Sequence, residues 1–322
     1  MSGTSDIDVL VSEVGPRDGL QSIKSIMPTP AKKAWIAAEA AAGVREIEVC
    51  SFVPARLMPQ MADAAEVVAY ARTIPGLTVL ALVPNFKGAE NAINAGAHKI
   101  ALPLSASETH SKANLRRSHA EVIEDVRRIA ELLRSLPAES RPGFEGNVAT
   151  AFGCTLEGVV PETKVVELAV ALMEAGCEEI GLSDTTGYAN PKQLRRLIRL
   201  VREAVGHDKL SSVHLHNTRG LGLANALAAL EEGITTLDSS LGGLGGCPHA
   251  PGASGNIVTE DLVFMLDAMG LRTGIDIRKL LEVRQILRES LPDDELYGFT
   301  PDAGLPKGYG PGGWGIGKQF ST

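Results

Sequence analysis

Short apolar runs rich in β-branched residues alternate with longer amphipathic stretches over most of the chain. The runs predict strands at residues 9–14, 46–50, 78–83, 99–104, 146–152, 179–183, 212–216 and 235–240. Apolar residues recur with a helical period between them, at residues 30–42, 64–73, 119–135, 161–175, 191–205 and 224–232. Several helical segments stop at a glycine before the next strand, as at Gly43, Gly96 and Gly176.

Eight strands that alternate with helices predict a parallel sheet closed into a TIM (β/α)8 barrel, with an open doubly wound sheet as the alternative fold. Two extra C-terminal helices are expected at residues 259–269 and 277–289. One catalytic domain therefore spans residues 1–290. Residues 291–322 are crowded with Gly and Pro and are expected to form a C-terminal arm or tail, which Tyr309 and Trp314 would help to order.

Composition narrows the classes of function. Hydrophobic residues make up 44% of the 322 residues and aromatic residues only 4%, as expected for a parallel sheet buried under helices. The formal net charge is −8 and no long basic run is present, which argues against nucleic-acid binding.

The location is expected to be cytoplasmic. No apolar stretch reaches the roughly 18 residues that a membrane helix needs, and the N-terminal residues lack the features of a signal peptide. Four cysteines, Cys50, Cys154, Cys177 and Cys247, show no CxxC pair, which favours free thiols in a reducing compartment.

Chemistry-bearing residues follow several of the predicted strands. Because catalytic groups of a TIM barrel lie at the C-terminal ends of its strands, residues far apart in sequence are expected to meet at one mouth. The set comprises Arg17, Asp18, Glu48, Asp184, His214, His216, Cys247 and Asn256.

His214 and His216 are the strongest metal candidates. Residues two apart on a strand point to the same face, here the barrel interior. Two imidazoles with the carboxylate of Asp18 and the amide oxygen of Asn256 suit a divalent cation. A nitrogen and oxygen donor set favours Mg²⁺ or Mn²⁺, with Zn²⁺ or Co²⁺ as alternatives. Two histidines that merely pack and hydrogen-bond are the simpler alternative.

Longer motifs carry a resemblance to a known family. They are GPRDGLQ, SFVPARLMPQMAD, LVPNFKGAENAINAGA, VHLHNTRGLGLANALAALEEG and DSSLGGLGGCPHAPGASGNIVTEDLVFML. Over roughly residues 11–277 the chain resembles the 3-hydroxy-3-methylglutaryl-CoA lyases, a family of the DRE-TIM metallolyase group. The cysteine-bearing loop is the most specific motif, because related condensing enzymes lack it.

The resemblance implies a role for most of these residues. Asp18, His214, His216 and Asn256 would ligate the metal, Arg17 would be the essential arginine and Glu48 its polar partner. Cys247 would be the catalytic thiol on a mobile loop, and Lys24 would contact CoA. Asp184 is a further catalytic candidate. For both Glu48 and Asp184, a structural role in orienting Arg17 or a metal ligand is the alternative. Barrels of this type are often dimers.

The expected activity is a metal-dependent carbon–carbon lyase that cleaves 3-hydroxy-3-methylglutaryl-CoA to acetyl-CoA and acetoacetate, or a close analogue such as citramalyl-CoA. A cation would polarise the 3-hydroxyl, His214 or Asp18 would accept its proton, and Arg17 would hold the enolate oxygen. Cys247 would close over the substrate with its loop and exclude water.

Some positions depart from the family and leave the acyl group open. Asn147 stands where the family has an aromatic residue, Glu145 stands where it has an arginine, and Arg219 adds a cation near the mouth. Two other functions remain alternatives. A Claisen-type synthase of the isopropylmalate or citramalate kind would usually carry a long extension. An inactive binding barrel would usually have lost some of the candidate residues.

Overall fold

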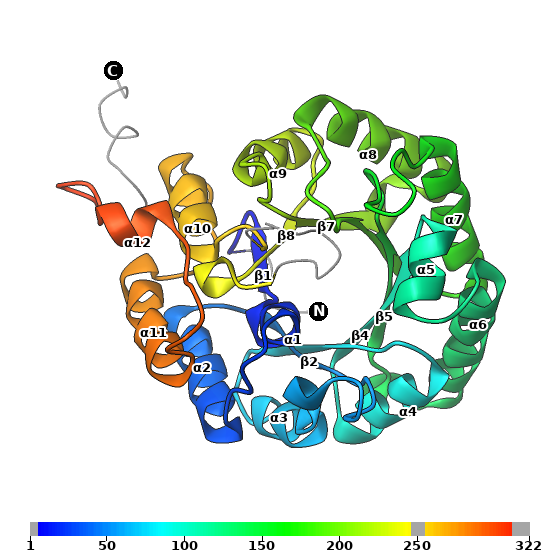
Figure 1. Cartoon of the computed structure of the whole chain (residues 1–322), viewed down its shortest axis with the longest axis horizontal. Helices are drawn as coiled ribbons and strands as arrows, with labels where there is room; N and C mark the ends of the chain where they lie inside the picture. Colours follow the sequence, from blue (N-terminus) through cyan, green and yellow to red (C-terminus); the bar gives the residue numbers. More distant parts are fainter. Residues whose placement is uncertain (1–5, 246–254, 311–322) are drawn as a thin grey trace.

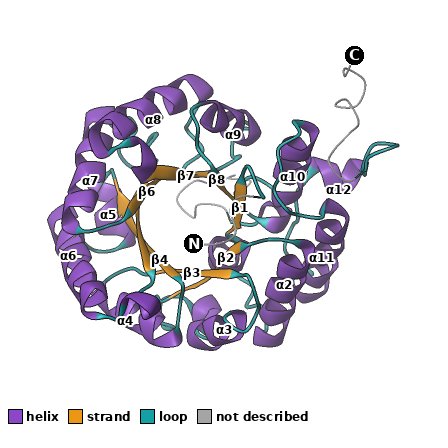
Figure 2. Ribbon diagram, turned by 180° about the vertical axis from the view of Figure 1, so that it is seen from behind, coloured by secondary structure: helices purple, strands orange, loops and turns teal. Residues whose placement is uncertain are grey.

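Eight parallel strands close into a barrel in a computed structural model that describes residues 6–245 and 255–310. Each strand pairs with the next along the chain, and β8 pairs with β1 to close the sheet (Figures 1 and 2). The strands are β1 (Leu10–Glu13), β2 (Glu46–Ser51), β3 (Thr78–Leu82), β4 (Lys99–Ser105), β5 (Gly143–Ala149), β6 (Glu179–Asp184), β7 (Leu210–Leu215) and β8 (Thr236–Ser239). The TIM barrel predicted from the pattern is confirmed.

A ring of helices surrounds the strands (Figure 2). The helices are α1 (Leu20–Ser22), α2 (Thr29–Ala42), α3 (Ala64–Ala71), α4 (Phe86–Ala95), α5 (Glu108–Asn114), α6 (His119–Ser135), α7 (Glu162–Ala175), α8 (Pro191–Val205), α9 (Gly222–Glu231), α10 (Thr259–Ala268), α11 (Ile277–Ser290) and α12 (Phe299–Ala303). Within the described ranges, none of them is long and apolar enough to cross a bilayer.

Two differences from the predicted pattern have local causes. Helix α4 lies outside the predicted helical ranges, because it contains Gly88, Asn91 and Asn94, residue types of low helix propensity. Strand β5 begins at Gly143 rather than at residue 146, because Gly143 pairs with Lys99 of the neighbouring strand. Tertiary pairing therefore extends the strand through Gly143 and Glu145, residue types that are depleted in strands.

The strands bury apolar residues outward and polar residues inward. Outward-facing side chains such as Ile47, Val49 and Ile100 are fully buried under the helices. The opposite face lines a cavity of about 810 Å³ inside the barrel and its mouth. That inner face carries Glu46, Glu48, Glu145, Asn147, Ser183, Ser212, His214, Thr236 and Asp238. A TIM-barrel interior is usually filled by branched apolar side chains, so this polar lining indicates a binding function.

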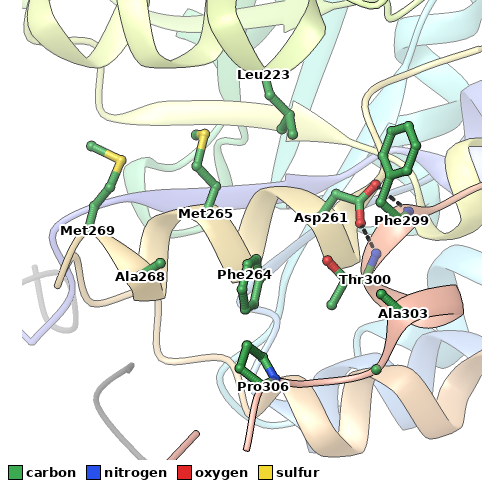
Figure 3. A pocket seen from close by; sticks show the side chains of 11 residues that line it. Leu223, Asp261, Phe264, Met265, Ala268, Met269, Phe299, Thr300, Ala303 and Pro306 are labelled. Carbon is green, nitrogen blue, oxygen red and sulfur yellow. Dashed lines mark hydrogen bonds between the residues drawn. The ribbon is translucent and has the colours of Figure 1, made fainter. Parts of the chain in front are cut away.

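The C-terminal segment packs against α10, the helix that follows β8 outside the barrel (Figure 1). Asp261 accepts hydrogen bonds from the backbone N–H groups of Phe299, at 3.0 Å, and Thr300, at 2.6 Å (Figure 3). The Tyr309 ring stacks on Phe264 with centroids 5.8 Å apart. The described part of the predicted arm, residues 291–310, is thus held on the barrel. Trp314 lies outside the described residues.

Candidate functional site

Asp18, His214 and His216 converge at the carboxyl ends of the strands. The two Nε2 atoms lie 3.1 Å apart. Each of these atoms lies 3.9 Å from Oδ2 of Asp18. Among the described residues, this trio is a group whose donor atoms are close enough together to hold one metal ion. The local cause is the alternation of β7, which turns both imidazoles to the cavity, while the π-helical turn η1 (Gly15–Gly19) after β1 presents Asp18.

Asn256 completes the cluster from the loop after β8. Its Nδ2 donates to Oδ2 of Asp18 at 2.7 Å and to the Leu244 carbonyl at 3.0 Å. Its Oδ1 is buried and has no hydrogen-bond partner among the described residues. Such an orphaned acceptor next to two imidazoles and a carboxylate fits a hard cation, which takes oxygen ligands readily.

Gly245 makes this close approach possible. Its φ is +108°, in the region that favours glycine, and a Cβ here would lie 2.4 Å from Nδ2 of Asn256 and 2.8 Å from Oδ2 of Asp18. Any side chain at this position would therefore separate two of the candidate ligands.

Asp238 belongs to the site and was missed by the sequence analysis. Its Oδ2 lies 3.1 Å from Nδ1 of His214, which orients that ring so that Nε2 faces the cluster. Burial opposes protonation of His214, but the bond to Asp238 and the charge of Asp18 raise its pKa. The strand register, in which Asp238 pairs with His214, is the signal that could have identified it.

The other imidazole is held neutral. Burial and the adjacent His214 lower the pKa of His216 to about 3. Burial also opposes ionisation of Asp18, but Arg17 and the two histidines hold its pKa below the ordinary value. A neutral imidazole and an ionised carboxylate are the protonation states that a metal ligand needs.

Arg17 joins Asp18 to Glu48. Its Nη1 donates to Oδ1 of Asp18, and its Nε donates to Oε2 of Glu48 at 2.5 Å. The exposed fraction is 8% for Arg17 and 2% for Glu48, so the pair is nearly withdrawn from water. Burial raises the pKa of Glu48 to about 7, in spite of the neighbouring guanidinium. Both residues line the cavity beside the metal-ligand candidates.

Two predicted residues lie apart from this cluster. Asp184 accepts from the backbone N–H groups of Tyr188 and Ala189, and it does not line the cavity although Ser183 does. Burial raises the pKa of Asp184 to about 6. Its geometry is that of a residue that holds the loop after β6, which favours the structural alternative over catalysis.

Lys24 is exposed just after α1 and is not among the residues that line the cavity. Cys247 lies outside the described residues. The structure therefore describes no contact of the predicted catalytic thiol.

Arg219 lies on the loop after β7, at the end of the barrel where the cavity opens, but it does not line the cavity. Its Nη1 donates to the carbonyls of Thr186 and Gly187, each at 3.1 Å. Its guanidinium lies 4.5 Å from the centroid of the Tyr188 ring. These contacts hold the Arg219 side chain against the loop after β6.

Three other arginines line the mouth of the cavity: Arg56, Arg116 and Arg117. Arg117 forms an ion pair with Asp125 at 3.3 Å. Arg116 is exposed and has a φ of +57°, a left-handed conformation that costs free energy in a residue other than glycine. Backbone strain at a cationic position of a cavity mouth points to a functional constraint.

The barrel floor is acidic. Lys99 pairs with Glu145 at 2.7 Å and with Glu179 at 2.6 Å, so its charge is already shared by two carboxylates. Above this pair, Ser183 donates to Oδ1 of Asn147 at 2.5 Å. The floor therefore presents carboxylates, hydroxyls and an amide to whatever enters the cavity.

The chain is similar in sequence to proteins of one known enzyme family. The HMGL-like family model matches residues 8–287. The chain is 42% identical to the mitochondrial hydroxymethylglutaryl-CoA lyase of Bos taurus over 289 residues, which covers 90% of this chain and 87% of the relative. It is 43% identical to the cytoplasmic 3-hydroxy-3-methylglutaryl-CoA lyase of Rattus norvegicus over 274 residues, covering 85% and 78% of the two chains.

Solved structures of HMG-CoA lyases have the same fold as this chain. An HMG-CoA lyase from A. baumannii, solved in complex with coenzyme A and 3-methylmalate, superposes with a TM-score of 0.87 at 40% identity and covers 97% of this chain and 99% of its own. Hydroxymethylglutaryl-CoA lyase from Pseudomonas aeruginosa gives a TM-score of 0.85 at 37% identity, with 92% and 96% covered.

Proposed function

This chain belongs to the HMGL-like family, and from that premise we propose that it is a metal-dependent carbon–carbon lyase acting on a 3-hydroxyacyl-CoA thioester. The observation that carries the proposal is the convergence of Asp18, His214, His216 and Asn256 beside the Arg17–Glu48 pair in one cavity. Four chain segments contribute to this cluster, which is difficult to explain by packing alone.

The donor set fits Mg²⁺ or Mn²⁺. Asp18, the two Nε2 atoms and the orphaned Oδ1 of Asn256 would hold the ion, with other positions open for substrate oxygens. When bound, the ion would polarise the 3-hydroxyl group and the nascent ketone.

Arg17 supplies the charge that an enolate needs. Cleavage of the C2–C3 bond leaves negative charge on the thioester oxygen, and a planar guanidinium is suited to hold it. Glu48 and Asp18 occupy Nε and Nη1, which fixes the plane of the guanidinium and directs Nη2 as a further donor. Loss of one such donor typically costs ~3–4 kcal/mol of transition-state stabilisation.

The proton of the 3-hydroxyl passes to a group of the same cluster. Asp18 and His214 are the two candidates, because both face the space between the imidazoles. With Nε2 on the ion and Nδ1 bonded to Asp238, His214 would have no lone pair free for this proton, which favours Asp18, whose carboxylate has a second oxygen. Cys247, which the family resemblance implies is the catalytic thiol, is the proposed acid that returns a proton to carbon.

The mouth suits the phosphates of CoA. Arg56, Arg116 and Arg117 line it together with the exposed Glu121, and the other lining carboxylates lie deeper. Guanidinium groups bind phosphates in a bidentate manner, so this distribution of charge would orient the thioester with its acyl group inward. Lys24 remains a proposed contact of CoA from the exposed turn after α1.

The acyl group is 3-hydroxy-3-methylglutaryl or a close analogue such as citramalyl. Asn147 and Ser183 offer hydrogen bonds to its distal end, while Lys99 is already paired. A distal carboxylate would therefore rely on Asn147 and Ser183 above the acidic floor, since Lys99 is not free to pair with it.

Product analysis tests the proposal. The enzyme is incubated with 3-hydroxy-3-methylglutaryl-CoA, with citramalyl-CoA, and with acetyl-CoA plus a keto acid, each with Mg²⁺ and with a chelator. Release of acetyl-CoA from a thioester, abolished by the chelator, is the expected result. Release of free CoA from acetyl-CoA would support a synthase instead, and inactivity with all three would contradict the proposal.

We also propose that the protein works in the cytoplasm as a homodimer. Cys50, Cys154 and Cys177 are free and buried, as expected in a reducing compartment. Light scattering of the purified protein tests the dimer, and fractionation of the source cells tests the compartment.

A further inference from the structure

The outer layer of the barrel contains a carboxylate where apolar residues are expected. Glu13, the last residue of β1, alternates with the inward-facing Ser12 and therefore points to the helices. The equivalent layer of the next strand holds Ile47 and Val49. Glu13 is fully buried, and burial raises its pKa to about 7. Burial of a carboxylate in an apolar layer lowers the stability of the fold, so we expect Glu13 to have a role that offsets this loss.

The hydrogen bonds of Glu13 join two loops of the site. Its Oε1 accepts from Gly15 at 2.8 Å and from Leu241 at 3.0 Å. Its Oε2 accepts from Oγ1 of Thr259 at 2.7 Å. Gly15 begins the turn that carries Arg17 and Asp18, and Leu241 begins the segment that leads away from β8.

Gly15 allows the carboxylate to come this close. A Cβ at this position would lie 2.5 Å from Oε1 of Glu13 and 2.8 Å from the Trp35 ring. The turn can therefore sit directly on the carboxylate only because residue 15 has no side chain.

The segment from Leu241 reaches Asn256 directly. The Leu244 carbonyl accepts from Nδ2 of Asn256 at 3.0 Å, and Ser240 N–H donates to the Ile257 carbonyl at 2.9 Å. Glu260 fastens the same segment from α10, accepting from Gly242 N–H at 3.0 Å. A displacement of the segment would therefore move Asn256 relative to Asp18.

We propose that Glu13 is a positioning residue, whose carboxylate sets the metal-binding turn with Arg17 and Asp18 in register with the loop that carries Asn256. The inference rests on the metal site proposed above. Glu13 touches neither the ion nor the substrate in this role and acts through Gly15 and Leu241.

Glu39 provides a matched control. It is a fully buried glutamate of α2 whose carboxyl interacts with Trp35 and Glu13, and none of its described contacts reaches the turn at Gly15 or the segment from Leu241. Glu39→Gln perturbs the same buried cluster and leaves the bonds from Glu13 to the two loops in place.

Affinity for Mn²⁺, measured from the spin resonance signal of free Mn²⁺, tests the role independently of turnover. Glu13→Gln keeps the length and the acceptor oxygen and should bind within about threefold of the wild type. Glu13→Asp and Glu13→Ala should bind at least about tenfold more weakly, as is typical when a group that orients metal ligands is lost. Glu39→Gln should bind as the wild type does. The Asp variant keeps the test valid if the Ala variant does not fold.

The outcomes separate the two proposals. Wild-type protein without Mn²⁺ affinity would overturn the metal site and this inference with it. Wild-type affinity retained in folded Glu13→Asp and Glu13→Ala would overturn only the role of Glu13. Equal loss of affinity in Glu39→Gln would also overturn it, because general disruption of the cluster would then explain the result.

Discussion

The Nε2 atoms of His214 and His216 lie 3.1 Å apart, each 3.9 Å from the same oxygen of Asp18. Neutral imidazoles gain little from this arrangement, since two nitrogen lone pairs and a carboxylate oxygen repel one another unless a proton or a cation lies between them. The relationship therefore supports a metal site more strongly than either histidine alone.

Removal of either imidazole should weaken metal binding. His214→Ala and His216→Ala are each expected to lower Mn²⁺ affinity by at least about tenfold, because one ligand nitrogen is lost. Titration followed by calorimetry measures the change. His207→Ala, on an exposed turn, is the control and should bind normally. Unchanged affinity in both site variants would refute the ligand assignment.

The planar guanidinium of Arg17 should be essential to turnover. Arg17→Lys is expected to reduce kcat by about 100- to 1,000-fold, since lysine cannot keep the contacts with Asp18 and Glu48 and also hold an enolate oxygen. Mn²⁺ affinity should change far less than kcat. Arg272→Lys, in an exposed ion pair with Asp8, should have normal kcat. Near-normal turnover of Arg17→Lys would be incompatible with the assigned role.

The strained cation at the mouth should affect substrate binding. Arg116→Ala is expected to raise KM for the CoA thioester by about three- to tenfold with little change in kcat, because one phosphate contact would be lost. Added salt should reduce the difference from the wild type. Arg127→Ala on the exposed face of α6 serves as control. A lower kcat with unchanged KM would argue against a role in binding CoA.

The buried glutamates should make stability depend on pH. Burial raises the pKa of Glu39 well above its ordinary value and that of Glu13 to about 7. Between pH 4.5 and 7 the folded state then binds more protons than the unfolded state, so these groups lower the free energy of unfolding as pH rises.

Glu39→Gln isolates part of this dependence. The variant should be more stable than the wild type at pH 8, and the difference should shrink towards pH 5, where the wild-type carboxyl is protonated in the folded state. Urea unfolding at both pH values measures it. A difference that is constant with pH, or larger at pH 5, would show that Glu39 titrates normally in the folded protein.

Local chemistry alone determined much of this protein. The alternation of apolar runs and helical periods predicted the closed barrel, and the spacing of His214 and His216 placed both rings on one face of β7. These features are readable because strand and helix periods are local properties of the chain. The convergence of Arg17, Asp18 and Asn256 could also be expected, because parallel strands bring their carboxyl ends to one mouth.

Which side chains contact one another at the site was decided only by the tertiary structure. Asp238 faces His214 through strand register, Arg219 is drawn to the loop after β6, and Asp184 is turned away from the cavity. In the sequence, Glu13 looks like an ordinary strand residue. Its partners Gly15 and Leu241 are more than 200 positions apart, so no local pattern links them. Such pairings depend on how separate elements pack, and that information is distributed over the whole chain rather than held in any local pattern.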